Sequence, residues 1–136
     1  MPRQARSRPV SLAQARAYVG KAQEYLAAAQ SELSAGRAIA ATSLAIHAGI
    51  NAADAVSGLR TGRRAAGQDH DEALELLREA GKDGADVARD LGRLLALKTK
   101  AEYEPDGIPI TEARRAVDRA SRCVAVAARV ADQRKP

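Results

Sequence analysis

The sequence of 136 residues predicts an all-α protein, an up-and-down helical bundle of four long helices plus one short helix. Long segments repeat apolar residues at helical spacing, and glycine or proline separates them. No segment alternates apolar and polar residues as a half-buried strand would. Trp and Phe are absent and hydrophobic residues make up 46% of the chain. The core is therefore expected to consist of small aliphatic side chains, which favour helices that approach closely.

The first helix is expected to begin after Ser11, a favourable N-cap, and to end at Gly36. Residues 1–10 contain two prolines and three arginines, so we expect a flexible basic N-terminal arm there. One domain is expected over residues 11–133. The apolar stripe of the first helix consists of Leu12, Val19, Leu26 and Leu33.

The second helix is expected from about Arg37 to Gly58 and is rich in alanine. Segment 60–68 is rich in glycine and arginine and interrupts the helical pattern. A short third helix then begins at Asp69, because Asp69 followed by Glu72 three residues later is typical of a capping box.

The fourth helix is expected over residues 85–103, and Pro105 ends it. A loop rich in proline and glycine follows. Thr111 is then expected to cap the fifth helix, residues 112–134. No internal repeat is evident.

Composition and charge limit the classes of function. The net charge is +5, which permits contact with RNA or DNA without requiring it. The single cysteine, Cys123, excludes an internal disulfide and a cysteine-based zinc site, and a buried thiol suits a cytoplasmic protein. We expect no signal peptide and no membrane span, because no stretch of about 18 uncharged apolar residues occurs. No metal or cofactor is expected, since His47 and His70 have no third ligand at metal spacing.

A narrow polar seam runs along the second helix in the segment SLAIHAGINAAD. Its four residues recur at steps of four, four and three and fall within roughly 80° of a helical wheel, between two apolar flanks. The fourth helix offers polar partners on its inward stripe. Three interpretations are open: a buried network that sets helix register, a ligand or partner cleft, and direct catalysis. The residues of this seam and its expected partners are Ser43, His47, Asn51, Asp54, Lys98, Glu102 and Tyr103.

A cationic edge is expected along the fifth helix, opposite its apolar side. This edge is either a solvated face, a phosphate or RNA contact, or a surface for an acidic protein. Exposed aromatic residues for base stacking are lacking, which disfavours base-specific recognition of single strands. The arginines of this edge are Arg115, Arg119, Arg122 and Arg129.

The order of three segments resembles the HEPN superfamily, in its small stand-alone bacterial form. SLAIHAGINAAD lies in the central helix, GRRAAGQDH follows it, and LKTKAEY comes before the last helix. The resemblance covers about residues 11–133, with Lys98 where arginine is usual and Glu102 in place of aspartate. It implies a helical bundle, often dimeric. It also implies RNA cleavage, nucleotide binding or partnership with a minimal nucleotidyltransferase in toxin–antitoxin and defence systems.

Members of this superfamily that cleave RNA carry arginine, four to six residues, then histidine, near the start of the last long helix. Here no histidine follows His70, and the pattern occurs only as Arg64, or Arg63, before His70. We therefore expect a non-catalytic partner or nucleotide- or RNA-associated component of a toxin–antitoxin or defence-type system. Its partners would be a second copy in a homodimer, a nucleotidyltransferase-type protein, or RNA or nucleotide.

Two alternatives stay open. The first is a metal-independent RNase toxin, in which His70 shuttles a proton and Arg64 holds the scissile phosphate. The second is a small-molecule binder, for a nucleotide, that uses the polar seam.

Overall fold

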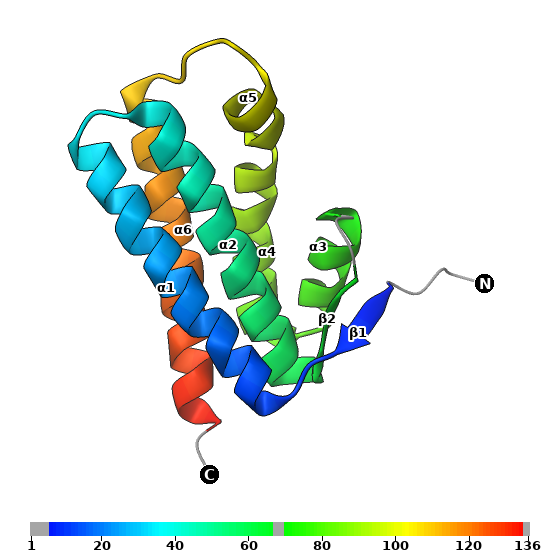
Figure 1. The fold of residues 1–136 in the computed structure, drawn as a ribbon. Helices are drawn as coiled ribbons and strands as arrows, with labels where there is room; N and C mark the ends of the chain where they lie inside the picture. The colour runs from blue at the N-terminus through cyan, green and yellow to red at the C-terminus, as the bar shows by residue number, and fades with distance from the viewer. Residues whose placement is uncertain (1–5, 67–69, 135–136) are drawn as a thin grey trace.

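Four helices lie side by side and alternate in direction (Figure 1). The computed structural model describes residues 6–66 and 70–134. Helices α1 and α4 run one way, and α2 and α6 run the other (Figure 1). These helices are α1 (Leu12–Ser34), α2 (Ala38–Thr61), α4 (Gly81–Leu95) and α6 (Ile110–Gln133).

Two short helices and a small ribbon complete the described structure. Helix α3 packs against α4, and α5 lies over one end of α2 (Figure 1). The ribbon pairs β1 with β2 in antiparallel fashion. These elements are α3 (His70–Arg78), α5 (Lys98–Tyr103), β1 (Ser7–Pro9) and β2 (Arg63–Ala65).

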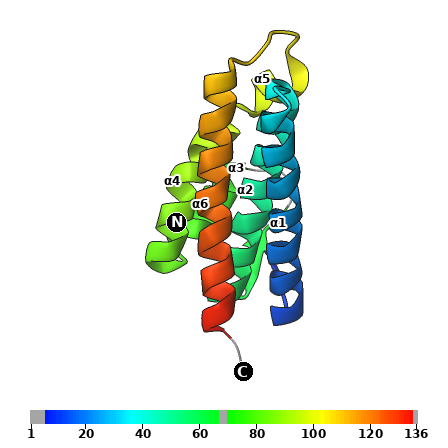
Figure 2. The same ribbon diagram turned by 90° about the vertical axis from the view of Figure 1, so that its left-hand side faces the viewer.

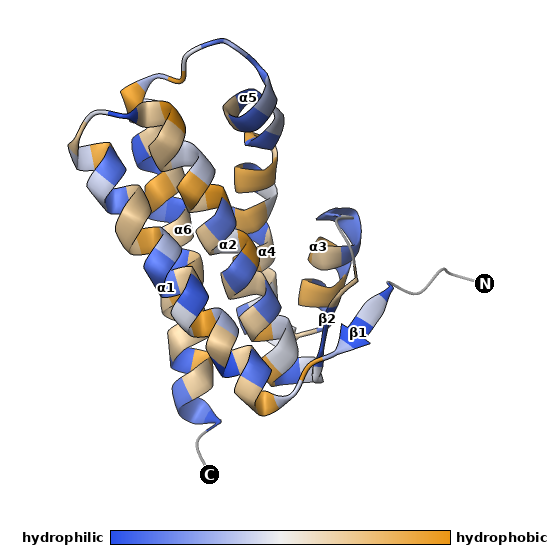
Figure 3. Ribbon diagram, in the orientation of Figure 1, coloured by the Kyte–Doolittle hydropathy of each residue, from blue (hydrophilic) through white to orange (hydrophobic). Residues whose placement is uncertain are grey.

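Helix α2 lies at the centre, since it contacts α1, α4 and α6. Helix α6 also contacts α1 and α4, and the view in Figure 2 shows α6 beside α1. A β-carbon added to Gly49 of α2 would lie 2.7 Å from Leu94 of α4. Glycine and alanine thus let the backbones approach closely, as expected for a core without Trp or Phe. Figure 3 shows polar residues concentrated at β2 and α5, beside this apolar core.

The mainly helical fold class is confirmed. The expected capping box at Ser11 is also confirmed: the Ser11 hydroxyl accepts a hydrogen bond from the Gln14 amide at 3.1 Å, and Gln14 accepts one in return. Cys123 is buried, as expected. The second predicted capping residue, Asp69, lies outside the described residues, among which α3 begins at His70.

The predicted division into four long helices and one short helix is not confirmed, because the segment 85–103 is not one helix. Helix α4 begins earlier, at Gly81, and ends at Leu95, while α5 is separate. A hydrogen bond of 3.0 Å from the Leu97 amide to the Leu94 carbonyl tightens the chain between them. No glycine or proline marks this break. Local helix propensity would continue α4 past Leu95. The contact of α5 with α2 instead turns the chain away from the axis of α4.

The expectation of no strand is wrong for the described part of the predicted arm, residues 6–10. Ser7–Pro9 pairs with Arg63–Ala65, and the Val10 amide donates to the Gly62 carbonyl at 2.8 Å. Val10 is buried. Its side chain packs where Gly58 leaves room, and this contact anchors the arm to α2.

One described helix, α2, is long and apolar enough to cross a membrane by length and composition. Within the bundle, 61% of its most apolar window is buried. A buried core helix passes the same test, so the finding is weak evidence for a membrane span.

Candidate functional site

A cleft of about 220 Å³ lies where five elements meet: α2, α3, α4, α5 and β2. Its wall from α4 is apolar, consisting of Leu91 and Leu95. Five polar or charged side chains from the other four elements face this wall. They are His47 and Asp54 of α2, Arg64 of β2, His70 of α3 and Lys98 of α5.

Lys98 and His70 meet in this cleft. The ammonium nitrogen of Lys98 lies 3.2 Å from Nε2 of His70. An ammonium group has three donors and no acceptor, so Nε2 of His70 is the acceptor in this contact. The break between α4 and α5 makes it possible, because Lys98 is the first residue of α5.

Asp54 is the carboxylate of the cleft. Within the described residues, no hydrogen bond or ion pair reaches its side chain, which is partly buried. Burial raises the pKa of Asp54 to about 6, and the positive charges of Arg64 and Lys21 partly oppose this rise. A carboxyl group that titrates near neutral pH in a cleft is typical of functional sites.

His47 lies at the edge of the cleft. Its Nε2 atom is 3.4 Å from a carboxylate oxygen of Glu102, and its ring stacks on Tyr25 with centroids 5.3 Å apart. Its backbone carbonyl accepts a hydrogen bond of 2.8 Å from the side-chain amide of Asn51. Two neighbouring helices, α1 and α5, thus hold this imidazole in one orientation.

A single buried network, one of the three interpretations of the polar seam, does not form among these residues. Asn51 is satisfied within α2, and no bond among the described residues joins Asp54 to Lys98. Tyr103 is 74% exposed. Ser43 lines a different, larger groove near the end of the bundle, which Glu102 also borders. Successive turns of α2 face different neighbours, so a stripe that looks continuous on a wheel is divided between two sites.

Arg64 is held at the mouth of the cleft by two contacts. Its guanidinium carbon lies 6.0 Å from the centroid of the Tyr18 ring, at the limit of a cation–π contact. One of its nitrogens donates to the carbonyl of Ala65 at 3.1 Å. The fold therefore brings Arg64 and His70 to the same cleft. Arg63 is instead directed to the ribbon, where it donates to the carbonyl of Ser7 at 2.9 Å.

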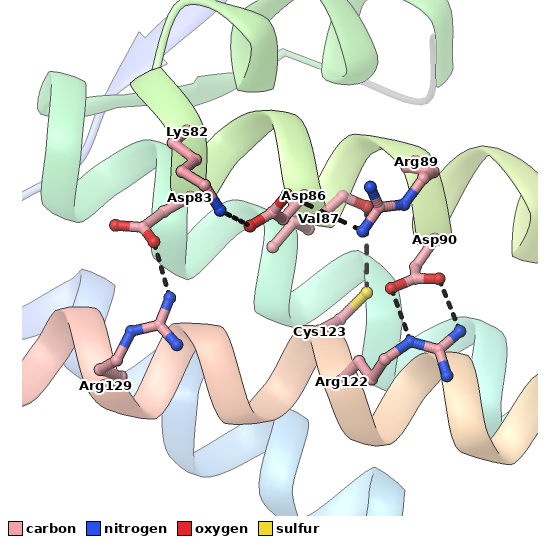
Figure 4. A network of polar contacts seen from close by, with 9 residues as sticks. All are labelled: Lys82, Asp83, Asp86, Val87, Arg89, Asp90, Arg122, Cys123 and Arg129. Carbon is pink, nitrogen blue, oxygen red and sulfur yellow. Dashed lines mark hydrogen bonds and ion pairs between the residues drawn. The ribbon is translucent and has the colours of Figure 1, made fainter.

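The arginines predicted along the last helix have different surroundings. Arg122 makes a two-pronged contact with Asp90 of α4, at 3.1 and 2.8 Å (Figure 4). Arg129 donates to Asp83 at 2.7 Å. These two arginines pair with carboxylates between α4 and α6, which leaves them poorly placed to contact phosphate.

The remaining two predicted arginines, Arg115 and Arg119, lie apart from these ion pairs. They line a shallow groove near the start of α6, together with Arg93 and Glu112. This groove is separate from the cleft that contains Arg64 and His70.

Among residues 6–66 and 70–134, no group of three or more histidine, cysteine or acidic side chains is placed to hold a metal ion. The fold and the site together describe a helical bundle with a polar cleft at the junction of five elements. Comparison with protein-family models and with curated proteins gives no significant match. The side chains of the cleft therefore provide the structural observations that bear on function.

Proposed function

We propose that this protein is a HEPN-like, non-catalytic component of a toxin–antitoxin or defence-type system, whose cleft binds a phosphate group of RNA or of a nucleotide. The sequence resemblance supports the type of system and a cytoplasmic location. The convergence of Arg64, His70 and Lys98 on one cleft supports the ligand class.

Each of these side chains suits a phosphate. A guanidinium can donate two parallel hydrogen bonds to phosphate oxygens, and a lysine adds a point charge. The contact between Lys98 and His70 can give way when Lys98 turns to a phosphate. The cleft volume of about 220 Å³ is smaller than the roughly 300–1,000 Å³ typical of sites for drug-sized ligands. It suits a phosphate with its adjoining sugar better than an entire nucleotide.

Binding measurements with Lys98→Ala and Arg64→Ala test this proposal. Loss of a hydrogen bond to a charged group costs about 1.5–3 kcal/mol, so each variant should bind AMP about 10- to 100-fold more weakly by calorimetry. Arg78→Ala is the matched control, because Arg78 is exposed on α3 and does not line the cleft. Equal affinities of all three variants and the wild type would refute the proposed site, as would the absence of binding at millimolar AMP.

A second candidate function is a metal-independent RNase, and the presence of Asp54 beside His70 and Arg64 favours it. His70 would take the proton from a ribose 2′-OH as the 2′-oxygen attacks phosphorus. The bond from phosphorus to the 5′-oxygen would break, and protonated Asp54 would supply the proton for that oxygen. Arg64 would hold the phosphate oxygens. The products would be a 2′,3′-cyclic phosphate and a free 5′-hydroxyl.

Cleavage and growth assays separate this candidate from the first. If the protein is an RNase, His70→Ala should lower cleavage of a fluorogenic oligoribonucleotide by about 10²- to 10⁴-fold, and EDTA should have no effect. Expression of the wild type should arrest growth, and expression of His70→Ala should not. Unchanged toxicity in His70→Ala would exclude this mechanism. Phosphate binding without any cleavage would support the non-catalytic role and exclude the RNase.

The proposed assembly is a homodimer, alone or with a nucleotidyltransferase-type protein, as the resemblance implies. Size-exclusion chromatography with light scattering should give twice the chain mass of 14.3 kDa. A monomer at tens of micromolar would contradict the dimer. That result would leave the phosphate site untouched, because all five polar side chains of the cleft belong to one chain.

A further inference from the structure

A second pocket, of about 260 Å³, lies beside the cleft, between the β-ribbon and the first turns of α1. Its charged lining residues are Arg8, Lys21 and Arg64. Arg8 and Arg64 face each other across the ribbon, and directly opposed residues of an antiparallel pair project to the same face. Lys21 lies three residues after Tyr18, which also lines the pocket, so both occupy one face of α1. Figure 1 shows the ribbon beside this end of α1.

The positive charges of this pocket are not neutralised by ion pairs. Within the part of the chain that the structure describes, no hydrogen bond or ion pair joins Arg8, Lys21 or Arg64 to a carboxylate. Arg122 and Arg129 contrast with them, since each makes close contacts with a carboxylate of α4. A concave pocket that gathers three such cations is suited to an anion.

Arg64 belongs to both pockets. The cleft and the cationic pocket are therefore neighbours that share one side chain. Lys21 is also near enough to Asp54 of the cleft for its charge to act on that carboxyl. Each volume, about 220 and 260 Å³, suits a phosphate and sugar but not a larger ligand. A ligand that uses all these cations must carry more than one phosphate and extend past Arg64.

We propose that the cleft and the cationic pocket form one continuous site for a single-stranded oligonucleotide, with Arg64 at the phosphate between them and Arg8 and Lys21 at the next phosphate. This inference rests on the proposed phosphate-binding function and specifies its ligand. Arg64 lies over the ring of Tyr18. This ring is therefore not open for a base to stack on it. The site recognises the sugar–phosphate backbone of the strand, independently of base sequence.

The salt dependence of oligonucleotide binding gives the loss of affinity expected when Arg8 and Lys21 are removed. Each phosphate contact on a single strand contributes about 0.7 to the slope of log affinity against log salt. Arg8 and Lys21 contact one phosphate in this arrangement, so removing both should lower that slope by about 0.7. At roughly 0.1 M salt this corresponds to about fivefold weaker binding.

The test compares two ligands by fluorescence anisotropy and calorimetry. One is a labelled 2′-O-methyl oligoribonucleotide of about eight nucleotides, which cannot be cleaved through a 2′-OH. The other is AMP. The double variant Arg8→Ala/Lys21→Ala should bind the oligonucleotide about fivefold more weakly and should bind AMP with unchanged affinity. The matched control is Arg78→Ala/Arg114→Ala, which removes equal charge at exposed sites outside both pockets.

Lys98→Ala distinguishes failure of this inference from failure of the proposed function. It should weaken binding of both ligands. If Lys98→Ala weakens AMP binding while the Arg8/Lys21 variant matches its charge control, the second pocket is not used and this inference fails alone. If Lys98→Ala affects neither ligand, both proposals fail. Equally tight binding of a duplex of the same length would overturn the single-strand assignment.

Discussion

Replacement of Asp54 by asparagine should stabilise the protein at neutral pH. Burial raises the pKa of Asp54 from an ordinary 3.8 to about 6, so the folded state holds this proton more tightly than the unfolded state does. Folding stability is therefore lost as pH rises from about 4 to 6 and stays low above that range. Each tenfold change in the proton equilibrium is worth about 1.4 kcal/mol, which sets an upper limit of about 3 kcal/mol. Asparagine has nearly the same shape as aspartate and carries no charge, so Asp54→Asn removes the cost of burying that charge.

Urea denaturation at a series of pH values measures this effect. Asp54→Asn should exceed the wild type in free energy of unfolding by about 2–3 kcal/mol at pH 8 and by almost nothing at pH 4. Asp106→Asn is the control, because Asp106 is exposed in the loop before α6. A difference between Asp54→Asn and wild type that is the same at pH 4 and pH 8 would refute the reasoning. A carboxylate retained at such a cost is typical of a residue kept for function.

Two further predictions concern packing between helices. A β-carbon at Gly84 would lie 1.9 Å from the carbonyl oxygen of Leu77, so Gly84→Ala should lower the free energy of unfolding by about 2 kcal/mol or more. Gly20→Ala, where nothing lies within 4 Å, should raise it by about 0.5–1 kcal/mol, and equal effects would contradict this account. In a double-mutant cycle, Asp90 and Arg122 should show a coupling energy of about 1 kcal/mol, because Arg122 is 58% exposed. Additive effects of the two substitutions would show that the ion pair contributes nothing.

Part of the candidate site could be predicted from the sequence. The spacing of Arg64 and His70, and the polar residues His47 and Asp54 on an apolar helix, identified four of the five polar side chains of the cleft, and Lys98 was expected nearby. Their sharing of one cleft could not be predicted, because the residues come from four elements whose packing no local pattern specifies. A helical wheel contains no information about which neighbour each turn faces.

The role of Arg8 and Lys21 had no signal in the sequence. Arg8 was expected in a flexible arm, and Lys21 is an ordinary polar residue on the exposed side of the first helix. Only the pairing of β1 with β2 places Arg8 opposite Arg64. Strand pairing at this separation in sequence depends on the burial of Val10 against α2, which local propensity does not encode.

The sequence by itself determined the helical class and the cap at Ser11, because periodicity and capping act over a few residues. Tertiary structure alone decided the break before Lys98, the ribbon at Ser7–Pro9 and the neutralisation of Arg122 by Asp90. Each of these depends on contacts between residues far apart in the chain. The energy of such contacts outweighs a local helix preference of less than about 1 kcal/mol per residue.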